Sequence, residues 1–585
     1  MHEEQFKLGA IMKFNKLAPG LEFIYQEFLA HGAEGAAREA ELCGLTGVDT
    51  TARMPRMHVF LEFIPEARLS NLKDHGAVLH AGGGCVRTAT VPLESLADLS
   101  DDPEIEYIAP SHQVHACIDV AAVSIGIDLM RARWGNGIGN GEGVLIGIID
   151  TGIDPTHRAF SGRIDRIWDQ TLPGKGLPEG NFGEELLGDG ILKSTDSQGH
   201  GTHVAGIAAG QDSQFMGVAP AAHIIVVKAL PGTLGLSAGI NYVFRIAGQL
   251  DMPAVVNVSW GSHGDAHDGT DPLSRMIDYW ARPGRIVCCA AGNEGQRDIH
   301  AGVDISPGSS EEIAVQSDAL PINIEAWCAA EAQLRMSVVS PSGQATPVEP
   351  LAPAPAKDPY TLPEGRARLV TRKDPGNQHH HMKVSIRPTS ARPGYQWRLH
   401  LENVGTEAVY VDAWLANVRE VREDVRFIGP GVVRGMRIGS PGAATSAITV
   451  ASYTTRTSWR CQDGCEKSLP LTPGAISDFS SDGPRRDGAP KPDLAAPGAM
   501  IISCRSHAYT ATTDWLIDDD YMIMGGTSMA CPFVAGLAAL MLERQPSLDP
   551  LQLKEIMRVH CVRAGHTPDD FDTKWGFGLI DASYL

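Results

Sequence analysis

One serine in this sequence lies where a glycine-rich turn meets an apolar helical pattern, which makes it a candidate nucleophile. Gly525 and Gly526 let the backbone approach a bound molecule, and Pro532 suits the first turn of a helix. Residues 533–542 are apolar nearly all round and predict a buried helix. Ser528 therefore stands at a helix N-terminus, where free N–H groups and the helix dipole stabilise a developing oxyanion.

A serine nucleophile needs a base, and two further residues, a carboxylate and a histidine, stand in settings that suit this task. Asp150 ends the apolar run 144–149, which is typical of a strand buried on both faces of a parallel sheet. Open sheets of this kind carry functional residues at the carboxyl ends of their strands. His200 begins a second apparent helix. The chain order Asp, His, Ser is that of one established catalytic triad.

Three motifs carry a resemblance to the subtilisin-like serine peptidases. They are Asp150-Thr151-Gly152, His200-Gly201-Thr202-His203 and Gly526-Thr527-Ser528-Met529-Ala530. Three flanking segments, 256–261, 290–295 and 491–498, agree with the same pattern. The resemblance covers residues 120–300 and 438–585. It implies that Ser528 attacks the scissile carbonyl, that His200 takes its proton, and that Asp150 fixes the imidazole tautomer.

The resemblance also implies roles for residues around the triad. Asn293 matches the side-chain donor of the oxyanion hole, which the backbone N–H of Ser528 completes. Substrate would bind as an extended strand between two backbone edges. Gly439 would form the floor of the first specificity pocket, where a glycine leaves room for a large substrate side chain. The size of the Trp260 side chain would affect the width of that pocket. The residues expected to touch substrate are Ser259, Trp260, Gly261, Leu234, Gly235 and Gly439.

The rest of the pattern around these motifs predicts an α/β fold. Residues 118–298 and 438–585 alternate apolar strands with helices, as in a parallel sheet with flanking helices. A polar, glycine-rich stretch at 163–196 is predicted as a surface loop. The strongest expected elements are strands at 144–149, 224–227, 254–258 and 285–290 and a helix at 237–250.

Between Asn293 and Ser528 the pattern changes. Residues 299–437 alternate with period two and predict an inserted β-sandwich, jelly-roll-like in the family resemblance. Its expected strands are 322–327, 334–339, 382–386, 397–401 and 409–415.

The front of the chain predicts a domain of its own. Residues 1–50 are expected to form a helical extension, and 51–117 follow the strand and helix order of a ferredoxin-like fold. In subtilisin-like enzymes such a domain resembles an inhibitory propeptide. Residues 107–117 would then lie in the cleft, with self-cleavage near Cys117; an uncleaved accessory domain is the alternative. The whole layout is similar to the Csp proteases of clostridial spore germination.

Composition limits the partners and the compartment. A net charge of −21 argues against nucleic acid or an anionic membrane as partner. No apolar run reaches the length that spans a bilayer, and residues 1–14 lack the pattern of a secretory signal. Eleven cysteines without framework spacing are typical of a reducing compartment. We expect a cytoplasmic protein, with secretion as the alternative.

No cofactor is expected from the sequence. Structural calcium is possible in such enzymes, but the loop 211–216 offers only Asp212 as a charged ligand, and calcium favours six to eight oxygens. The run 379–381 of histidines and the pair Cys461 and Cys465 lack partners at zinc-site spacing, so no metal is predicted.

The sequence thus predicts a serine endopeptidase that acts on proteins or peptides through an acyl-enzyme. Its own N-terminal domain would be an intramolecular inhibitor that the enzyme removes itself. The alternative from another class is a catalytically latent regulatory protein, in which the front domain stays bound and the insert recruits a partner. A structural β-protein with a relic peptidase would require a broken triad.

Overall fold

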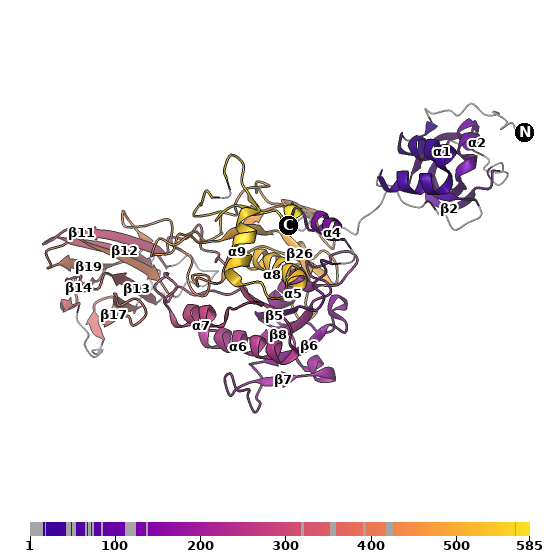
Figure 1. Cartoon of the computed structure of the whole chain (residues 1–585). Coiled ribbons are helices and arrows are strands. Elements are labelled where there is room, and N and C mark those ends of the chain that lie inside the picture. The colour runs from indigo at the N-terminus through magenta and orange to yellow at the C-terminus, as the bar shows by residue number, and fades with distance from the viewer. Residues whose placement is uncertain are drawn as a thin grey trace, which may run out of the picture. The chain divides into compact units, whose positions relative to one another are not determined.

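The structure is a computed structural model (Figure 1). It describes residues 16–17, 19–42, 48, 54–64, 67, 72, 75–83, 86–110, 124–135, 138–317, 321–351, 359–389, 394–416, 425–567 and 569–585. The chain divides into two compact units, residues 1–115 and 116–585. Among the helices in these ranges, none combines the length and the apolar character that crossing a bilayer requires.

The first unit is a four-stranded antiparallel sheet with helices packed against it. Its elements are α1 (Pro19–Leu42), β1 (Arg56–Phe63), β2 (Val78–Gly83), β3 (Val86–Pro92), α2 (Leu96–Asp101) and β4 (Ile105–Pro110). The strands lie in the order β2-β3-β1-β4. Leu21 and Ile24 of α1 are fully buried in the same core as Met57 and Leu61 of β1. Helix α1 is therefore part of this unit and not a separate extension.

Strand β4 shortens the segment expected to enter the cleft. Tyr107 to Ala109 pair with β1, and the strand continues to Pro110. Residues 107–110 are thus sheet and not a free tail. Cys117, the expected processing position, lies outside the described residues.

The second unit is built on a ten-stranded sheet, which belongs to an α/β body formed by residues 124–298 and 438–585. Its strands are β5 (Leu145–Asp150), β6 (Ile164–Asp169), β7 (Glu184–Leu186), β8 (His223–Lys228), β9 (Ala254–Val258), β10 (Arg285–Ala290), β22 (Ile448–Thr454), β25 (Leu494–Ala499), β28 (Cys561–Val562) and β29 (Leu579–Ile580). They lie in the order β28-β29-β25-β22-β10-β9-β5-β8-β6-β7. All neighbours are parallel except the pairs at the two edges, β28–β29 and β6–β7. The predicted parallel fold is confirmed, with its four expected strands as β5, β8, β9 and β10.

Helices cover both faces of this sheet, which explains why the strands are apolar throughout. On one face lie α4 (Ile127–Trp134), α5 (His200–Ala209), α8 (Thr527–Arg544) and α9 (Pro550–Val559); on the other lie α6 (Thr233–Leu250) and α7 (Pro272–Trp280) (Figure 1). Along β5, Ile146 and Ile148 belong to the first core, while Leu145 and Ile149 belong to the second. Helix α8 is buried on every side from Thr527 to Leu542.

The stretch 163–196 is not the surface loop that its polar composition predicted. It contributes β6 and β7 to the edge of the sheet and a short 3-10 helix, Gly188–Lys193. Trp168 of β6 is fully buried and stacks on Phe182, with ring centroids 5.5 Å apart. A few large apolar side chains therefore outweigh the surrounding glycines and charges.

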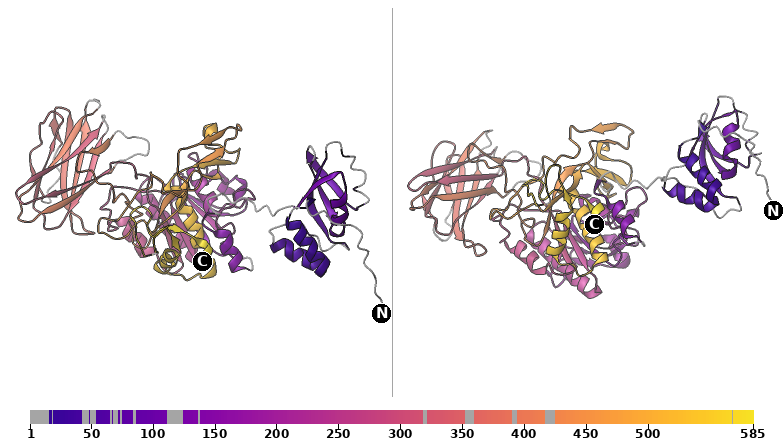
Figure 2. Two further views of the ribbon diagram at one scale, coloured as in Figure 1. Left: turned by 90° about the horizontal axis from the view of Figure 1, so that it is seen from above. Right: turned by 45° about the horizontal axis from the view of Figure 1, so that its top comes forward.

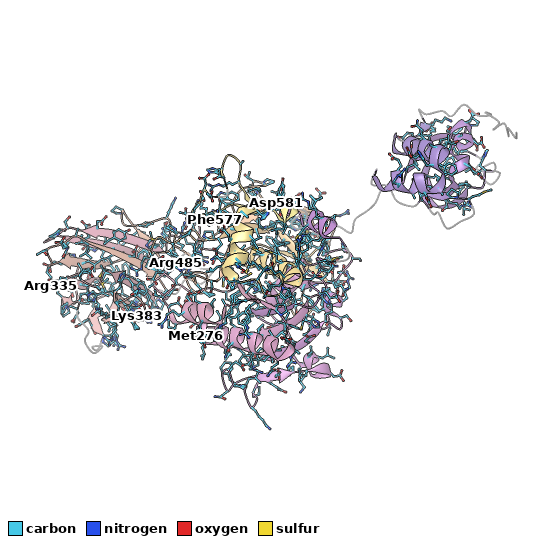
Figure 3. The ribbon with its side chains drawn as sticks, viewed as in Figure 1. Met276, Arg335, Lys383, Arg485, Phe577 and Asp581 are labelled. Carbon is cyan, nitrogen blue, oxygen red and sulfur yellow. The ribbon has the colours of Figure 1, made fainter. Side chains whose placement is uncertain are left out.

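The insert, residues 299–437, is a sandwich of two antiparallel sheets (Figure 2). Its strands are β11 (His300–Ile305), β12 (Ser310–Ser317), β13 (Ile322–Cys328), β14 (Leu334–Val339), β15 (Glu349–Pro350), β16 (Tyr360–Leu362), β17 (Gly365–Lys373), β18 (His380–Pro388), β19 (Gln396–Asn403), β20 (Val409–Leu415) and β21 (Val425–Ile428). One sheet has the order β11-β20-β13-β18-β17-β16 and the other β15-β14-β19-β12-β21. Trp397 and Phe427 fill the space between them, while Arg335 and Lys383 point outward from the two sheets (Figure 3).

A stack of aromatic rings joins the insert to the α/β body. Trp414 of β20 lies between His267 of the body and His300 of β11, with ring centroids 4.1 Å and 4.5 Å away. Its indole N–H donates to the carbonyl of Met436 at 2.9 Å. Because all three rings are fully buried, this contact holds the insert against the loop that follows β9.

Candidate active site

Asp150 and His200 form a hydrogen-bonded pair at the end of β5. His200 Nδ1 donates to Asp150 Oδ1 at 2.6 Å, and Asp150 is fully buried. The start of α5 comes this close because residue 201 is glycine: a Cβ there would lie 2.2 Å from the carbonyl oxygen of Gly152. The donating Nδ1 leaves Nε2 as the basic nitrogen of a neutral imidazole.

Asp196 positions this pair, and sequence reasoning missed it. Its Oδ1 accepts from the backbone N–H of Gly199 at 2.9 Å and from the hydroxyl of Thr151 at 2.8 Å. Its Oδ2 accepts from the backbone N–H and the hydroxyl of Thr202, at 2.9 Å and 2.7 Å. One buried carboxylate thus ties the turn after β5 to the first turn of α5. The available signal was an aspartate three residues before the glycine that precedes a helix.

Ser528 occupies the first turn of α8, and its hydroxyl and carbonyl are both held by Ser259. Ser528 Oγ donates to the carbonyl of Ser259 at 3.1 Å, and Ser259 Oγ donates to the carbonyl of Ser528 at 3.0 Å. Ser528 and His200 line the same two cavities. For the imidazole to take the hydroxyl proton, that proton has to turn from the Ser259 carbonyl toward His200.

The Asn293 amide is oriented by the residue before the serine. Asn293 Oδ1 accepts from the backbone N–H of Thr527 at 2.9 Å and from the Thr527 hydroxyl at 3.1 Å. A backbone N–H can only donate, so the oxygen must face Thr527. The amide NH₂ is therefore available to donate elsewhere, and Asn293 lines both cavities beside Ser528. Together with the backbone N–H of Ser528 in the first turn of α8, it can stabilise an oxyanion.

A cavity of about 590 Å³ beside Ser528 contains most of the predicted substrate contacts. Ser259, Trp260, Gly261 and Gly439 all line it. A Cβ at Gly439 would lie 2.0 Å from the carbonyl oxygen of Ser262, so only glycine fits this position. His263 and Glu294 also line the cavity, and sequence reasoning did not single them out.

The second predicted edge differs from its expected form. Leu234 and Gly235 lie in the first turn of α6 and not in an extended segment, and neither is among the residues that line the two cavities. The Gly235 carbonyl accepts from the side-chain amide of Gln170 at 3.0 Å. The helix begins earlier than the sequence pattern indicated because Gly235 packs directly against Leu230: a Cβ would lie 2.4 Å from its carbonyl oxygen.

The second cavity, of about 980 Å³, brings the insert to the active site. Besides His200, Asn293 and Ser528, it is lined by Val425 and Arg426 of strand β21. Its opposite side comes from the segment between β26 (Ile501–Cys504) and β27 (Tyr521–Met524), including Tyr509, Thr510, Ala511, Thr512 and Trp515. An extended chain bound across Ser528 would therefore run between the body and the insert.

In the described part of the chain, no group of three or more histidine, cysteine, aspartate or glutamate side chains is placed to hold a metal ion. Asp212 accepts from Arg158 Nε at 2.8 Å. His381 pairs with Glu325 at 2.7 Å, and Cys461 donates to the carbonyl of Asp514 at 3.2 Å. These side chains are engaged with protein partners.

A parallel sheet with aspartate at a strand end, and with histidine and serine at the starts of two helices on one face, defines the class of subtilisin-like peptidases. The chain belongs to the subtilase family, whose sequence model (Peptidase_S8) matches residues 141–347 and 416–578.

Two curated relatives come from Bacillus subtilis (strain 168). The Major intracellular serine protease is 32% identical over 191 residues, which cover 31% of this chain and 53% of that protein. Serine protease AprX is 23% identical over 494 residues, which cover 81% of this chain and 73% of that protein. The chain thus spans about half the length of the first relative and 73% of the length of the second.

Among solved structures, the CspB protease of Clostridium perfringens matches with a TM-score of 0.63 and 25% identity, over 79% of this chain and 95% of that one. The expected likeness to the Csp proteases is therefore confirmed. That match extends beyond the α/β body, because the body alone makes up a smaller share of the chain.

Proposed function

We propose that this protein is a serine endopeptidase that hydrolyses peptide bonds through an acyl-enzyme. The orientation of the Asn293 amide is the observation that supports this most. An asparagine held by its oxygen, with its NH₂ beside a serine and a histidine–aspartate pair, is what a tetrahedral oxyanion requires. The family and the curated serine proteases among its relatives agree with this function.

In the proposed reaction, Ser528 Oγ attacks the carbonyl carbon of the substrate while its proton passes to His200 Nε2. Asp150 stabilises the resulting imidazolium through the bond to Nδ1. The negative charge on the carbonyl oxygen is held by the Asn293 amide and the Ser528 backbone N–H. His200 then gives its proton to the leaving amine, the C–N bond breaks, and a water repeats the sequence on the ester to release the acid.

The proposed substrate is an extended segment of a protein or peptide. Ser259, Trp260 and Gly261 would pair with its backbone on one side of the cleft. Gly439 leaves the floor of the first pocket free of a side chain. In place of Leu234 and Gly235, the insert strand β21 and the segment 509–515 would contact the residues beyond the cleaved bond.

We further propose that the first unit is an inhibitory domain removed by self-cleavage near Cys117. Its separate sheet and core are compatible with folding independently of the second unit. The same observation also favours the alternative, a latent regulatory protein that keeps this unit bound. We expect the protein to act in the cytoplasm, because the eight cysteines within the described ranges are all unpaired thiols. Nucleic acid and membranes are not expected as partners of so acidic a chain.

Labelling with a fluorophosphonate tests the chemistry. The reagent should modify folded wild-type protein at Ser528 and should not modify Ser528→Ala. A folded wild-type chain that takes no label would overturn the proposal and favour the binding protein. Intact mass separately tests the processing: wild type should be cut near Cys117, and Ser528→Ala should remain whole.

A further inference from the structure

A second histidine–carboxylate pair lies in the wall of the cavity beside Ser528. His263 Nε2 is 3.3 Å from Glu294 Oε2, and the two side chains are 11% and 12% exposed. Both residues line the cavity together with Gly439 and Ser528. Ser481 holds the carboxylate from behind, since its hydroxyl donates to Glu294 Oε2 at 3.0 Å. Nothing in the proposed acyl transfer uses this pair.

The hydrogen bonds behind His263 fix its protonation state. His267 Nδ1 is 2.9 Å from the carbonyl oxygen of Asp265, which only accepts, so Nδ1 carries the proton. Burial lowers the pKa of His267 far below its usual range, so this imidazole is neutral and its Nε2 is a bare lone pair. That lone pair is 3.0 Å from His263 Nδ1, which must therefore donate.

A neutral His263 cannot satisfy both of its partners. With its proton on Nδ1 for His267, its Nε2 would point a lone pair at the carboxylate of Glu294. Only the imidazolium donates to both. When His263 is protonated, the wall of the pocket carries a positive charge on His263 and a negative charge on Glu294, and these two charges sum to zero.

The charged groups around His263 favour this state. Burial alone would lower the pKa of His263, but the bond to Glu294 and the nearby Asp265 outweigh burial and the repulsion from Arg437, so the pKa is raised. The pKa of Glu294 is lowered by the same bond against its own burial. Burial, with Asp271 nearby, raises the pKa of Asp265 to about 7. Arg437 is itself neutralised by Asp482 through two bonds of 2.7 Å.

We propose that His263 sets the charge of the primary specificity pocket, so that the enzyme selects lysine or arginine before the cleaved bond only when His263 is uncharged. Loss of its proton removes the positive charge closest to the Glu294 carboxylate, and Arg297 remains as the other cation that acts on it. The carboxylate, which is 12% exposed in the cavity wall, then attracts a cationic side chain. With the proton present, the pair presents no net charge and uncharged side chains are accepted. This inference rests on the proposed peptidase function.

Two peptide substrates that differ only before the cleaved bond test it on the full wild-type chain. The ratio of kcat/KM for the lysine peptide to that for the norleucine peptide should rise about tenfold between about pH 6 and pH 9. A ratio that stays constant over this range overturns the proposal. The ratio cancels the titration of His200, which affects both substrates alike.

Two variants separate His263 from other groups that titrate. His263→Asn keeps a donor for His267 but removes the positive charge, so the ratio at pH 6 should already be about tenfold above wild type. Glu294→Gln removes the negative charge, so the ratio at pH 9 should stay low. Asp265 deprotonates over the same range near Ser440, and these two comparisons at fixed pH do not depend on it. The proposal is contradicted if the kcat/KM ratio equals that of wild type in His263→Asn at pH 6 or in Glu294→Gln at pH 9.

His223→Asn is the matched control. His223 forms a 2.9 Å pair with Asp165 at the surface, and neither residue is among those that line the two cavities. Its ratio should follow wild type at every pH. If neither peptide is cleaved and fluorophosphonate does not label Ser528, the proposed function has failed; labelling and cleavage with an unchanged ratio refute only the role of His263.

Discussion

The cleft contains two histidine–carboxylate pairs with opposite geometry. In the first, His200 turns Nδ1 to Asp150 at 2.6 Å. In the second, His263 turns Nε2 to Glu294 at 3.3 Å and Nδ1 to another histidine at 3.0 Å. A neutral His200 satisfies its carboxylate and still offers a lone pair, whereas a neutral His263 cannot satisfy both neighbours.

The difference shows that residue type alone does not assign a catalytic role. A general base must be able to exist in its neutral form with the correct nitrogen free. The first pair meets this condition, whereas the second holds a proton between two acceptors and is suited to set the charge of the pocket.

The largest expected effect is on the first pair. Asp150→Asn should lower kcat about 10,000-fold for every substrate, because it favours the wrong tautomer of His200. Glu294→Gln should lower kcat for the norleucine peptide far less. Steady-state kinetics with both peptides measure this, and an equally large loss in Glu294→Gln would place the second pair in the chemistry.

Asn293, which precedes Glu294 in the sequence, should affect kcat for every substrate, as the His200–Asp150 pair does. Asn293→Ala should reduce kcat about 100- to 1,000-fold with little change in KM, because the amide acts on the oxyanion and not on the bound substrate. The loss should be equal for the lysine and norleucine peptides. A change confined to KM would contradict the role of Asn293.

A single methyl group should damage the first pair indirectly. Gly201→Ala puts a Cβ 2.2 Å from the carbonyl of Gly152, so the start of α5 must move away from β5. We expect a loss of about 1–3 kcal/mol in the free energy of unfolding and a clear fall in kcat. Urea unfolding and kinetics measure both. Gly190→Ala, where a Cβ meets no atom within 4 Å, is the control and should change neither by much.

The smallest effect concerns the second pair and stability. Because the pKa of His263 is raised in the folded protein, its contribution to stability is complete below pH 6.5, its ordinary pKa. That contribution is lost as the pH rises through the pKa of His263 in the folded protein. Because the pKa of Glu294 is lowered in the folded protein, its contribution to stability is present above pH 4.5, its ordinary pKa, and is lost as the pH falls through its pKa in the folded protein. His263→Asn should therefore lower Tm most between these two pH values and less at pH 9. A difference in Tm between wild type and His263→Asn that is the same at every pH would contradict the pair.

Sequence motifs were sufficient for the residues whose chemistry depends on short local patterns. Asp150, His200, Asn293 and Ser528 each stand in a recognisable run, and the structure places His200, Asn293 and Ser528 around the same cavities and Asp150 against His200. The parallel strands were equally clear, since burial on both faces makes them continuously apolar.

The rest depends on contacts between distant segments. His263 has no periodic pattern around it, and its partner Glu294 comes from another strand end 31 positions later. Asp196 bonds to Thr151, from a different element. Strand β6 was missed because polar residues surround Trp168, and the helix start at Leu234 because Gly235 is a poor helix former whose packing decides its conformation.

The position of the insert also determines when the site can exist during synthesis. Asp150, His200 and Asn293 all precede it, while β22, β25 and helix α8, which contains Ser528 in its first turn, follow it. A nascent chain that has been translated only through the insert therefore has the carboxylate, the histidine base and an oxyanion donor but no nucleophile. The sheet beside β10 is also still incomplete at that stage. Proteolytic competence would thus require translation through Ser528, and a chain released before that residue would be inert.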